Sequence, residues 1–286
     1  MIRKIGSVVL LLLWLAIILL PGYFGWDYYT SKPHDRVFTE IHGLLKPTGI
    51  IGHGYGIIGT VFMVIGVATY MMRKRLSFMQ NWGKLKSWLH FHIFLCTTGP
   101  ALVIWHTTFK FHGLVSISFW SMVIVVASGV FGRYVYNRIP KTEDGFFQNI
   151  EFILKEKLTL KNRISEHLEL STETVNVLGL HDAPDKFNTP WAALFNALKY
   201  DLTGLFRRQR DRKYLESLDM DDEICQTLIS AVKDYRWRNR QQFLIEPMQK
   251  LFGYWHVFHI PLAIIMFIIL AVHVGVAITF GYTWIF

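Results

Sequence analysis

Cysteine is almost absent from this chain of 286 residues, which contains only Cys96 and Cys225. Two cysteines are too few for an iron–sulfur cluster, which normally takes four, and the chain has no CxxCH motif for covalent haem attachment. Cys96 lies in an apolar segment and Cys225 in a polar one, so we expect no disulfide between them. Any redox cofactor is therefore expected to be held non-covalently, with histidine as the obvious ligand.

Charge is absent from several long stretches, and 52% of the residues are hydrophobic. Apolar runs of about 20 residues predict transmembrane helices, because the hydrocarbon core of a bilayer is roughly 30 Å thick. Five runs reach or nearly reach this length: residues 7–22, 50–72, 88–107, 115–136 and 254–280. The first run is short and follows a basic start, but no small-x-small cleavage site follows it. We therefore expect a retained anchor rather than a signal peptide.

Net positive charge is absent from residues 137–252, which contain eighteen basic and eighteen acidic residues. The excess of +9 comes from residues beside the apolar runs: Arg3, Lys4, Arg73, Lys74, Arg75, Lys84, Lys86, Lys110 and Arg133. This positive-inside pattern argues against a nucleic-acid partner and predicts an integral membrane protein in contact with lipid. The pattern places the N-terminus, residues 73–87 and residues 137–252 in the cytoplasm. Residues 23–49, residues 108–114 and the C-terminus are then outside.

The apolar runs predict an all-α fold, a polytopic membrane bundle of five transmembrane helices with a mostly helical cytoplasmic insert between helices four and five. Residues 1–136 would hold the first four helices, residues 137–252 the insert, and residues 253–286 the fifth helix. The insert has no glycine-rich nucleotide fingerprint, so we expect it to bind neither flavin nor nicotinamide.

Within the insert, helical periodicity predicts helices over residues 146–170, 190–206 and 221–244, and Pro247 marks the approach to the last span. The helix over residues 190–206 is amphipathic and is followed by Arg207-Arg208-Gln209-Arg210. An apolar face that ends in arginines suits a helix lying at the anionic inner leaflet. A face packed on the rest of the insert is an equally good interpretation.

Two histidine pairs have the same spacing, His92 with His106 and His259 with His273, each with thirteen residues between. Fourteen helical steps place two side chains roughly 40° apart around the helix and about 21 Å apart along it. An intramembrane histidine indicates a functional site by default, although one near a span end can simply lie at the interface. Because both helices would run from inside to outside, His92 would face His259 and His106 would face His273. Each pair would then give two axial imidazoles to one haem b, an arrangement suited to electron transfer.

Other residues near these pairs are secondary candidates. His90 lies about 160° around the helix from His106, and His256 about 100° from His273, so we rank both as supporting, interfacial or quinone-contacting residues. Gly99 would let a flat macrocycle approach the backbone, or would simply accompany a kink at Pro100. Arg133 is expected to pair with a propionate of the inner haem.

Two groups of residues are candidates for a quinone site, since both contain side chains that exchange protons. They are His53 with Tyr55 at the outer level, and His90 with Trp255 and His256 at the inner level. Residues of the interfacial aromatic belt would have the same composition.

Several motifs occur in and beside the apolar runs. They are Gly99-Pro100-Ala101-Leu102, Trp105-His106-Thr107-Thr108-Phe109, Ser118-Phe119-Trp120-Ser121-Met122, Ser128-Gly129, Gly132-Arg133-Tyr134, and Trp255-His256-Val257-Phe258-His259-Ile260-Pro261-Leu262 running to His273. These motifs resemble bacterial dihaem cytochromes b of the ferric-reductase-like transmembrane class, which implies a location in the bacterial cytoplasmic (inner) membrane. The resemblance covers about a third of the chain and implies a helical bundle that holds two b haems. The chain departs from the eukaryotic ferric reductases and NADPH oxidases, which carry a C-terminal flavin and nicotinamide module, and its insert is larger than the compact family core.

These observations together predict a dihaem b-type cytochrome subunit of a quinone-linked oxidoreductase complex. It would conduct electrons across the membrane between a quinone pool or a partner redox subunit and an acceptor on the other side. One alternative is an autonomous transmembrane ferric or quinone reductase. A second is a haem-free transporter whose histidines handle protons or metal ions.

Overall fold

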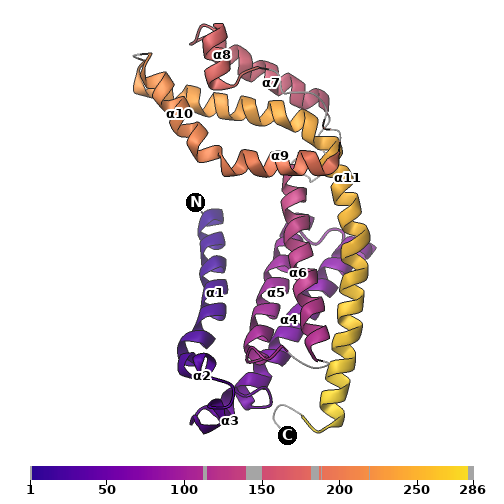
Figure 1. The fold of residues 1–286 in the computed structure, drawn as a ribbon. Coiled ribbons are helices and arrows are strands. Elements are labelled where there is room, and N and C mark those ends of the chain that lie inside the picture. Colours follow the sequence, from indigo (N-terminus) through magenta and orange to yellow (C-terminus); the bar gives the residue numbers. More distant parts are fainter. Residues whose placement is uncertain are drawn as a thin grey trace. The chain divides into compact units, whose positions relative to one another are not determined.

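The computed structural model describes residues 2–111, 115–139, 150–181, 187, 189–218 and 220–282, and all regular structure within these ranges is helical (Figure 1). The chain forms two compact units. The first unit comprises Met1–Gly129 with His259–Phe286, and the second comprises Val130–Phe258. Both boundaries fall inside a helix, the first in α6 (Val115–Arg138) and the second in α11 (Asp222–Thr279).

Four helical segments of the described chain are long and apolar enough to cross a membrane: His42–Arg75, Leu85–His106, Ser116–Arg138 and Asp222–Thr279. They cover, to within one residue at an end, the apolar runs predicted over residues 50–72, 88–107, 115–136 and 254–280. The predicted run at residues 7–22 lies in α1 (Ile2–Phe24), whose apolar stretch Leu11–Phe24 is shorter. The helical, multi-pass membrane character is therefore confirmed, and a fifth span stays a prediction.

Glycines allow α4 (Ile50–Arg75) and α5 (Leu85–His106) to pack closely in antiparallel directions (Figure 1). A Cβ atom added to Gly59 would lie 2.6 Å from the carbonyl oxygen of Gly99, and one added to Gly99 would lie 2.5 Å from that of Gly59. Small residues at such positions let two membrane helices bring their backbones together. At Gly59 and Gly99 the two helix backbones therefore approach too closely for any side chain larger than glycine.

Helix α1 packs on α5 through two indole groups. Trp14 donates a hydrogen bond of 3.1 Å to the Thr97 hydroxyl, and Trp105 donates one of 3.0 Å to the Ile18 carbonyl. A Cβ atom on Gly22 would lie 2.8 Å from the Trp105 ring, so the glycine makes room for that indole.

A segment of short helices, α2 (Trp26–Thr30), η1 (Arg36–Phe38) and α3 (His42–Leu45), lies between α1 and α4. Its buried Arg36 donates hydrogen bonds to the carbonyl oxygens of Tyr29 (2.9 Å), Ser31 (3.1 Å) and Thr108 (2.6 Å). A buried cation is stable only when such partners surround it. Arg36 thus ties this segment to the turn that follows α5, where Thr108 has a φ of 49°.

The second unit contains α7 (Ile150–Ser165), α8 (Thr172–Leu178), α9 (Pro190–Leu202) and α10 (Gly204–Glu216), together with the ends of α6 and α11 that belong to it. One of its cores gathers residues of α7, α8, α10 and α11, namely Ile164, Leu178, Leu215, Leu228, Val232 and Tyr235. The other gathers residues of α6, α9 and α11, namely Val135, Ile139, Ala193, Ala197, Leu244, Met248 and Leu251. Arg236 forms a buried ion pair with Asp211 between α11 and α10.

The predicted end of the third insert helix at Leu244 is wrong, because α11 continues from Asp222 through Pro247 to Thr279. Proline removes one backbone donor and usually kinks or ends a helix. Here Leu244, Met248 and Leu251 recur at helical spacing and are buried on both sides of Pro247, so packing holds the helix through the weak position. The predicted helix over residues 190–206 is also divided, since α9 ends at Leu202 and α10 begins at Gly204. Part of the predicted helix over residues 146–170 lies outside the described residues.

Candidate functional site

Two of the three histidines of α5, His92 and His106, each contact a backbone carbonyl of α4. The Nδ1 atom of His92 lies 3.0 Å from the carbonyl oxygen of Gly66, and the Nδ1 atom of His106 lies 2.8 Å from that of Gly52. A carbonyl oxygen only accepts hydrogen bonds, so Nδ1 carries the proton in each ring. The Nε2 atom of each neutral imidazole then keeps its lone pair, which is the state that ligates a metal.

The same spacing occurs on both helices. His92 and His106 are fourteen residues apart on α5, and their carbonyl partners Gly66 and Gly52 are fourteen residues apart on α4. Because the helices are antiparallel, one rigid contact sets both imidazoles in equivalent positions at two heights about 21 Å apart. The two sites are therefore built in the same way.

Glycine is required beside His106. A Cβ atom on Gly56 would lie 2.9 Å from Cγ and from Nδ1 of the His106 ring, closer than real Cβ contacts. His92 has two further neighbours, since the Cys96 sulfur of α5 lies 3.6 Å from the His92 Nδ1 atom and the ring centroid of Tyr70 of α4 lies 5.3 Å from that of His92. Contacts with α4, joined at His92 by Cys96 of its own helix, therefore surround both rings.

The histidines of α11 have partners of a different kind. His259 Nδ1 lies 2.7 Å from the Ser128 hydroxyl of α6, and a Cβ atom on the adjacent Gly129 would lie 3.7 Å from the His259 ring. A hydroxyl both donates and accepts, so this contact orients the His259 ring without fixing its tautomer. His273 lies in the wall of a cavity that α4, α5, α6 and α11 surround.

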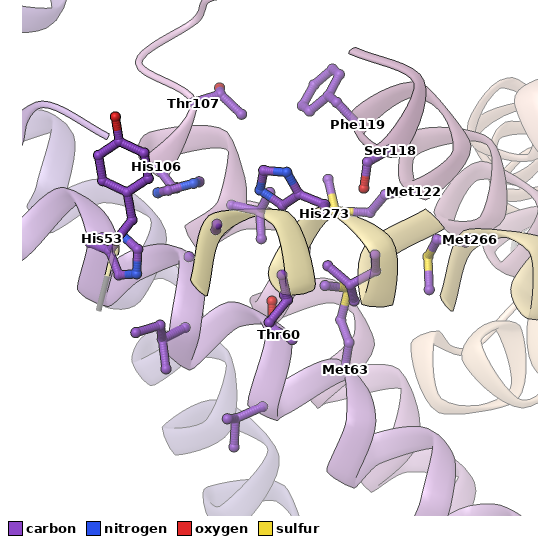
Figure 2. A pocket seen from close by; sticks show the side chains of 18 of the residues that line it. His53, Thr60, Met63, His106, Thr107, Ser118, Phe119, Met122, Met266 and His273 are labelled. Atoms are coloured by element: carbon purple, nitrogen blue, oxygen red, sulfur yellow. The ribbon is translucent and has the colours of Figure 1, made fainter. Parts of the chain in front are cut away.

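That cavity has a volume of about 460 Å³, within the roughly 300–1,000 Å³ typical of ligand sites, and its wall is mainly apolar (Figure 2). His53, His106 and His273 all line it. The labelled neighbours are Thr60 and Met63 of α4, Ser118, Phe119 and Met122 of α6, Met266 of α11, and Thr107 (Figure 2). The cavity therefore brings together the two histidines that were predicted to form the outer pair.

His53 is the third imidazole of this cavity. Its ring centroid lies 6.1 Å from that of His106, with the two planes almost perpendicular at 88°. The sequence suggested His53 only as part of a quinone site, without a link to His106. His53 follows Gly52, whose carbonyl oxygen accepts a hydrogen bond from His106. The first turn of α4 therefore makes both the hydrogen bond to the His106 ring and the ring contact of His53 with it.

The remaining predicted residues lie in different surroundings. Neither His92 nor His259 lines the cavity that contains His106 and His273. His92 contacts the Gly66 carbonyl, and His259 contacts the Ser128 hydroxyl. Gly99 is buried against Gly59 and Met63 of α4, so the contact that the structure gives it is helix packing. Arg133 belongs to the second unit, where its guanidinium lies 5.7 Å from the Tyr136 ring centroid. The proposed roles of Gly99 beside a macrocycle and of Arg133 at a propionate stay predictions.

The two histidines ranked as secondary lie elsewhere as well. His90 is exposed on α5, whereas the His256 ring packs 5.0 Å from the Phe252 ring and 4.8 Å from the Trp255 ring. Both histidines make further interactions. Their positions agree with the helix geometry that separated them from His106 and His273.

Sequence reasoning missed the groups that orient the imidazoles. Backbone carbonyls carry no side-chain signature, so Gly52 and Gly66 were not singled out. A signal was nevertheless present, because Gly52, Gly56, Gly59 and Gly66 follow one another at steps of four, three and seven residues. Such spacing places them along one face of a helix and predicts a close helix contact.

Comparison with protein-family models, with curated proteins and with solved structures finds no match for this chain. In the part of the chain that the structure describes, no group of three or more His, Cys, Asp or Glu side chains is placed to hold a metal ion. A functional assignment therefore has to come from the geometry of the histidines and of the cavity.

Proposed function

We propose that the chain is a dihaem b-type cytochrome membrane subunit that conducts electrons across the membrane. It would pass them between a quinone pool or a partner redox subunit and an acceptor on the other side. The observation that carries the proposal is the matched pair of hydrogen bonds from His92 and His106 to the carbonyl oxygens of Gly66 and Gly52. Histidines that bind metal almost always donate their second ring N–H to such an acceptor, which fixes both tautomer and orientation.

The outer cavity suits a large, flat, mainly apolar cofactor. Its walls are apolar, its volume is about 460 Å³, and it presents His106 from α5 and His273 from α11. In the proposed arrangement these two residues would hold one haem b between them. Met63, Phe119, Met122 and Met266 form a buried cluster in the same region and would exclude water from its faces. A bound haem supplies reversible one-electron exchange at its iron.

The inner pair would be His92 and His259. Gly66 orients the first ring and Ser128 contacts the second, while Gly129 leaves space beside His259. In this proposal Arg133 would balance a propionate charge, and Gly99 would let a macrocycle approach the backbone of α5. All four histidines belong to the first unit, so a single compact body would carry both haems.

The route of electrons to and from this body is also a proposal. His53 lies in the outer cavity, so it supports a quinone contact at the outer level more directly than His90, Trp255 and His256 do at the inner one. The positive-inside pattern supports a bacterial inner-membrane location with the N-terminus and residues 137–252 in the cytoplasm, and the C-terminus outside. A redox partner subunit on either face would complete the path.

The ligand assignment is tested by removing histidines in turn. We expect the single variants His106→Ala and His273→Ala and the double variant each to retain one of the two b haems, because both residues belong to the outer site. His90→Ala, which changes an exposed histidine of the same helix, is the matched control and should keep both. The measurement is the reduced-minus-oxidised spectrum of the purified protein with haem quantified as the pyridine complex. A double variant that keeps both haems would contradict the assignment.

The same preparation separates the alternatives. An autonomous ferric or quinone reductase would oxidise a quinol or reduce ferric chelates without another subunit. A proton or metal transporter would show no haem absorbance at all.

A further inference from the structure

The second unit exposes a stripe of large apolar side chains along α9 and the start of α10. Trp191, Phe195, Leu198 and Leu202 recur at steps of four, three and four residues, which places them on one face of α9. Leu205 and Phe206 follow in the first turn of α10. The exposed fractions of these six residues range from 43% to 78%. We refer to the six as the α9–α10 stripe.

Helix α9 is attached to the rest of the unit by its small residues. Ala193 and Ala197 are fully or almost fully buried, in a core with Val135, Ile139 and Met248. An amphipathic helix that served only the core would bury its largest apolar side chains and expose small ones. In α9 Leu194 also packs against this core. The side chains of Trp191, Phe195, Leu198 and Leu202 are nevertheless exposed, so packing on the rest of the insert does not account for them.

The attachment places α9 at the end of a membrane-spanning helix. Tyr134 of α6 donates a hydrogen bond of 2.8 Å to the Asp201 carboxylate of α9, and Arg138 of α6 forms an ion pair with the same group. The Phe131 ring stacks on Trp191 at 6.2 Å. Figure 1 shows α9 lying across the C-terminal turns of α6. Since the candidate span Ser116–Arg138 ends here, α9 is fixed where the apolar run of α6 gives way to arginine.

Lysine and arginine residues are neighbours of the α9–α10 stripe in the sequence. Lys199 is exposed on α9, and Arg208 and Arg210 are exposed on α10, while Arg207 lies over the Tyr200 ring at 3.6 Å from its centroid. Exposed apolar side chains beside Lys and Arg are the combination that binds a helix in the plane of an anionic membrane surface.

We propose that α9 and the first turn of α10 form a lipid-binding surface. The α9–α10 stripe would enter the acyl boundary of the leaflet at which α6 ends, and the nearby cations would contact anionic headgroups. The surface would hold the second unit against the bilayer independently of any cofactor in the first unit. Its test is therefore separate from the test of haem binding.

The depth of α9 in a bilayer can be measured with spin labels in the full chain. Phe195→Cys and Leu202→Cys place labels on the stripe, and Lys161→Cys at an exposed position of α7 in the same unit is the control. Cys96 and Cys225 are replaced by Ala in all three, and circular dichroism checks that the helices remain. In nanodiscs of phosphatidylcholine with phosphatidylglycerol, labels at 195 and 202 should be more accessible to oxygen than to a nickel chelate. The label at 161 should show the opposite order.

Two results would overturn the proposal. Labels at 195 and 202 that are as open to the nickel chelate as the label at 161 would show a solvated face. Labels shielded from both oxygen and nickel would show a protein contact, either a second copy or another subunit. A second measurement keeps the native cysteines and compares the chain with its Trp191→Phe variant in brominated lipid. Loss of a lipid-quenched fluorescence component in the variant supports the proposal, and unchanged quenching contradicts it.

The charge contribution is tested separately. Arg208→Gln/Arg210→Gln, and replacement of phosphatidylglycerol by phosphatidylcholine, should each move the label at 195 to a shallower depth. Lys161→Gln/Lys233→Gln removes the same charge from exposed positions of α7 and α11 and should leave the depth unchanged. Equal effects of the two double variants would contradict a role for the arginines beside the stripe.

Discussion

At the scale of single residues, backbone geometry decides how each imidazole is presented. His92 and His106 donate from Nδ1 to the carbonyl oxygens of Gly66 and Gly52, so their Nε2 atoms are the ones that can ligate a metal. The spacing of the histidines could be taken from the sequence, and so could their placement on one helix face. The acceptors could not be, because a backbone carbonyl is identified only when the partner helix is in place.

Gly56 offers a sharp test at this scale. Gly56→Ala puts a methyl group 2.9 Å from the His106 ring, so the ring must turn away from its hydrogen bond with Gly52. We expect the variant to lose the outer haem and keep the inner one, which halves the haem content to about one per chain. Haem quantification of the purified variant measures this.

Gly275→Ala is the matched control, because a methyl group there has no atom within 4 Å and the position is also inside a helix. It should keep two haems. Full haem content in Gly56→Ala, with an unchanged spectrum, would show that the His106 ring is not held as described.

At the scale of elements, the pair of α4 and α5 is the framework of the site. Apolar length predicted both helices from the sequence, since charge-free runs mark spans with little ambiguity. Their close contact was not predicted, although the glycines of α4 recur on one face. The predicted helix end at Leu244 is wrong for a related reason, because burial of Leu244, Met248 and Leu251 outweighs the helix-breaking effect of Pro247.

The framework is tested by separating the two helices. Gly59→Ala puts a Cβ atom 2.6 Å from the Gly99 carbonyl oxygen, which pushes the backbones apart. Overpacking of this kind costs about 1–3 kcal/mol of unfolding free energy. Unfolding of the detergent-solubilised protein by denaturant or heat, followed by circular dichroism, measures the loss.

Gly253→Ala serves as the control for Gly59→Ala, since nothing lies within 4 Å of the added methyl group in α11. Replacing glycine by alanine inside a helix is otherwise stabilising by up to about 1 kcal/mol. Equal stability of the two variants would mean that the contact of α4 with α5 is looser than described.

At the scale of the whole molecule, the candidate haem ligands and the cavity lie in only one of the two compact units. The first holds His92, His106, His259 and His273, together with the cavity, and the second holds none of these four. The second unit instead has two cores of its own and the exposed α9–α10 stripe. The composition of residues 137–252 predicted a separate, balanced-charge segment, but the boundaries of the two units fall within α6 and α11, where the sequence has no break.

The haem content of the unmodified chain tests the central claim most directly. The chain would be purified from membranes in mild detergent, and haem would be measured as the pyridine complex against protein mass. The account predicts two non-covalent b haems per chain, with reduced bands typical of low-spin bis-histidine ligation. A chain that carries no haem after expression with sufficient haem supply would contradict it.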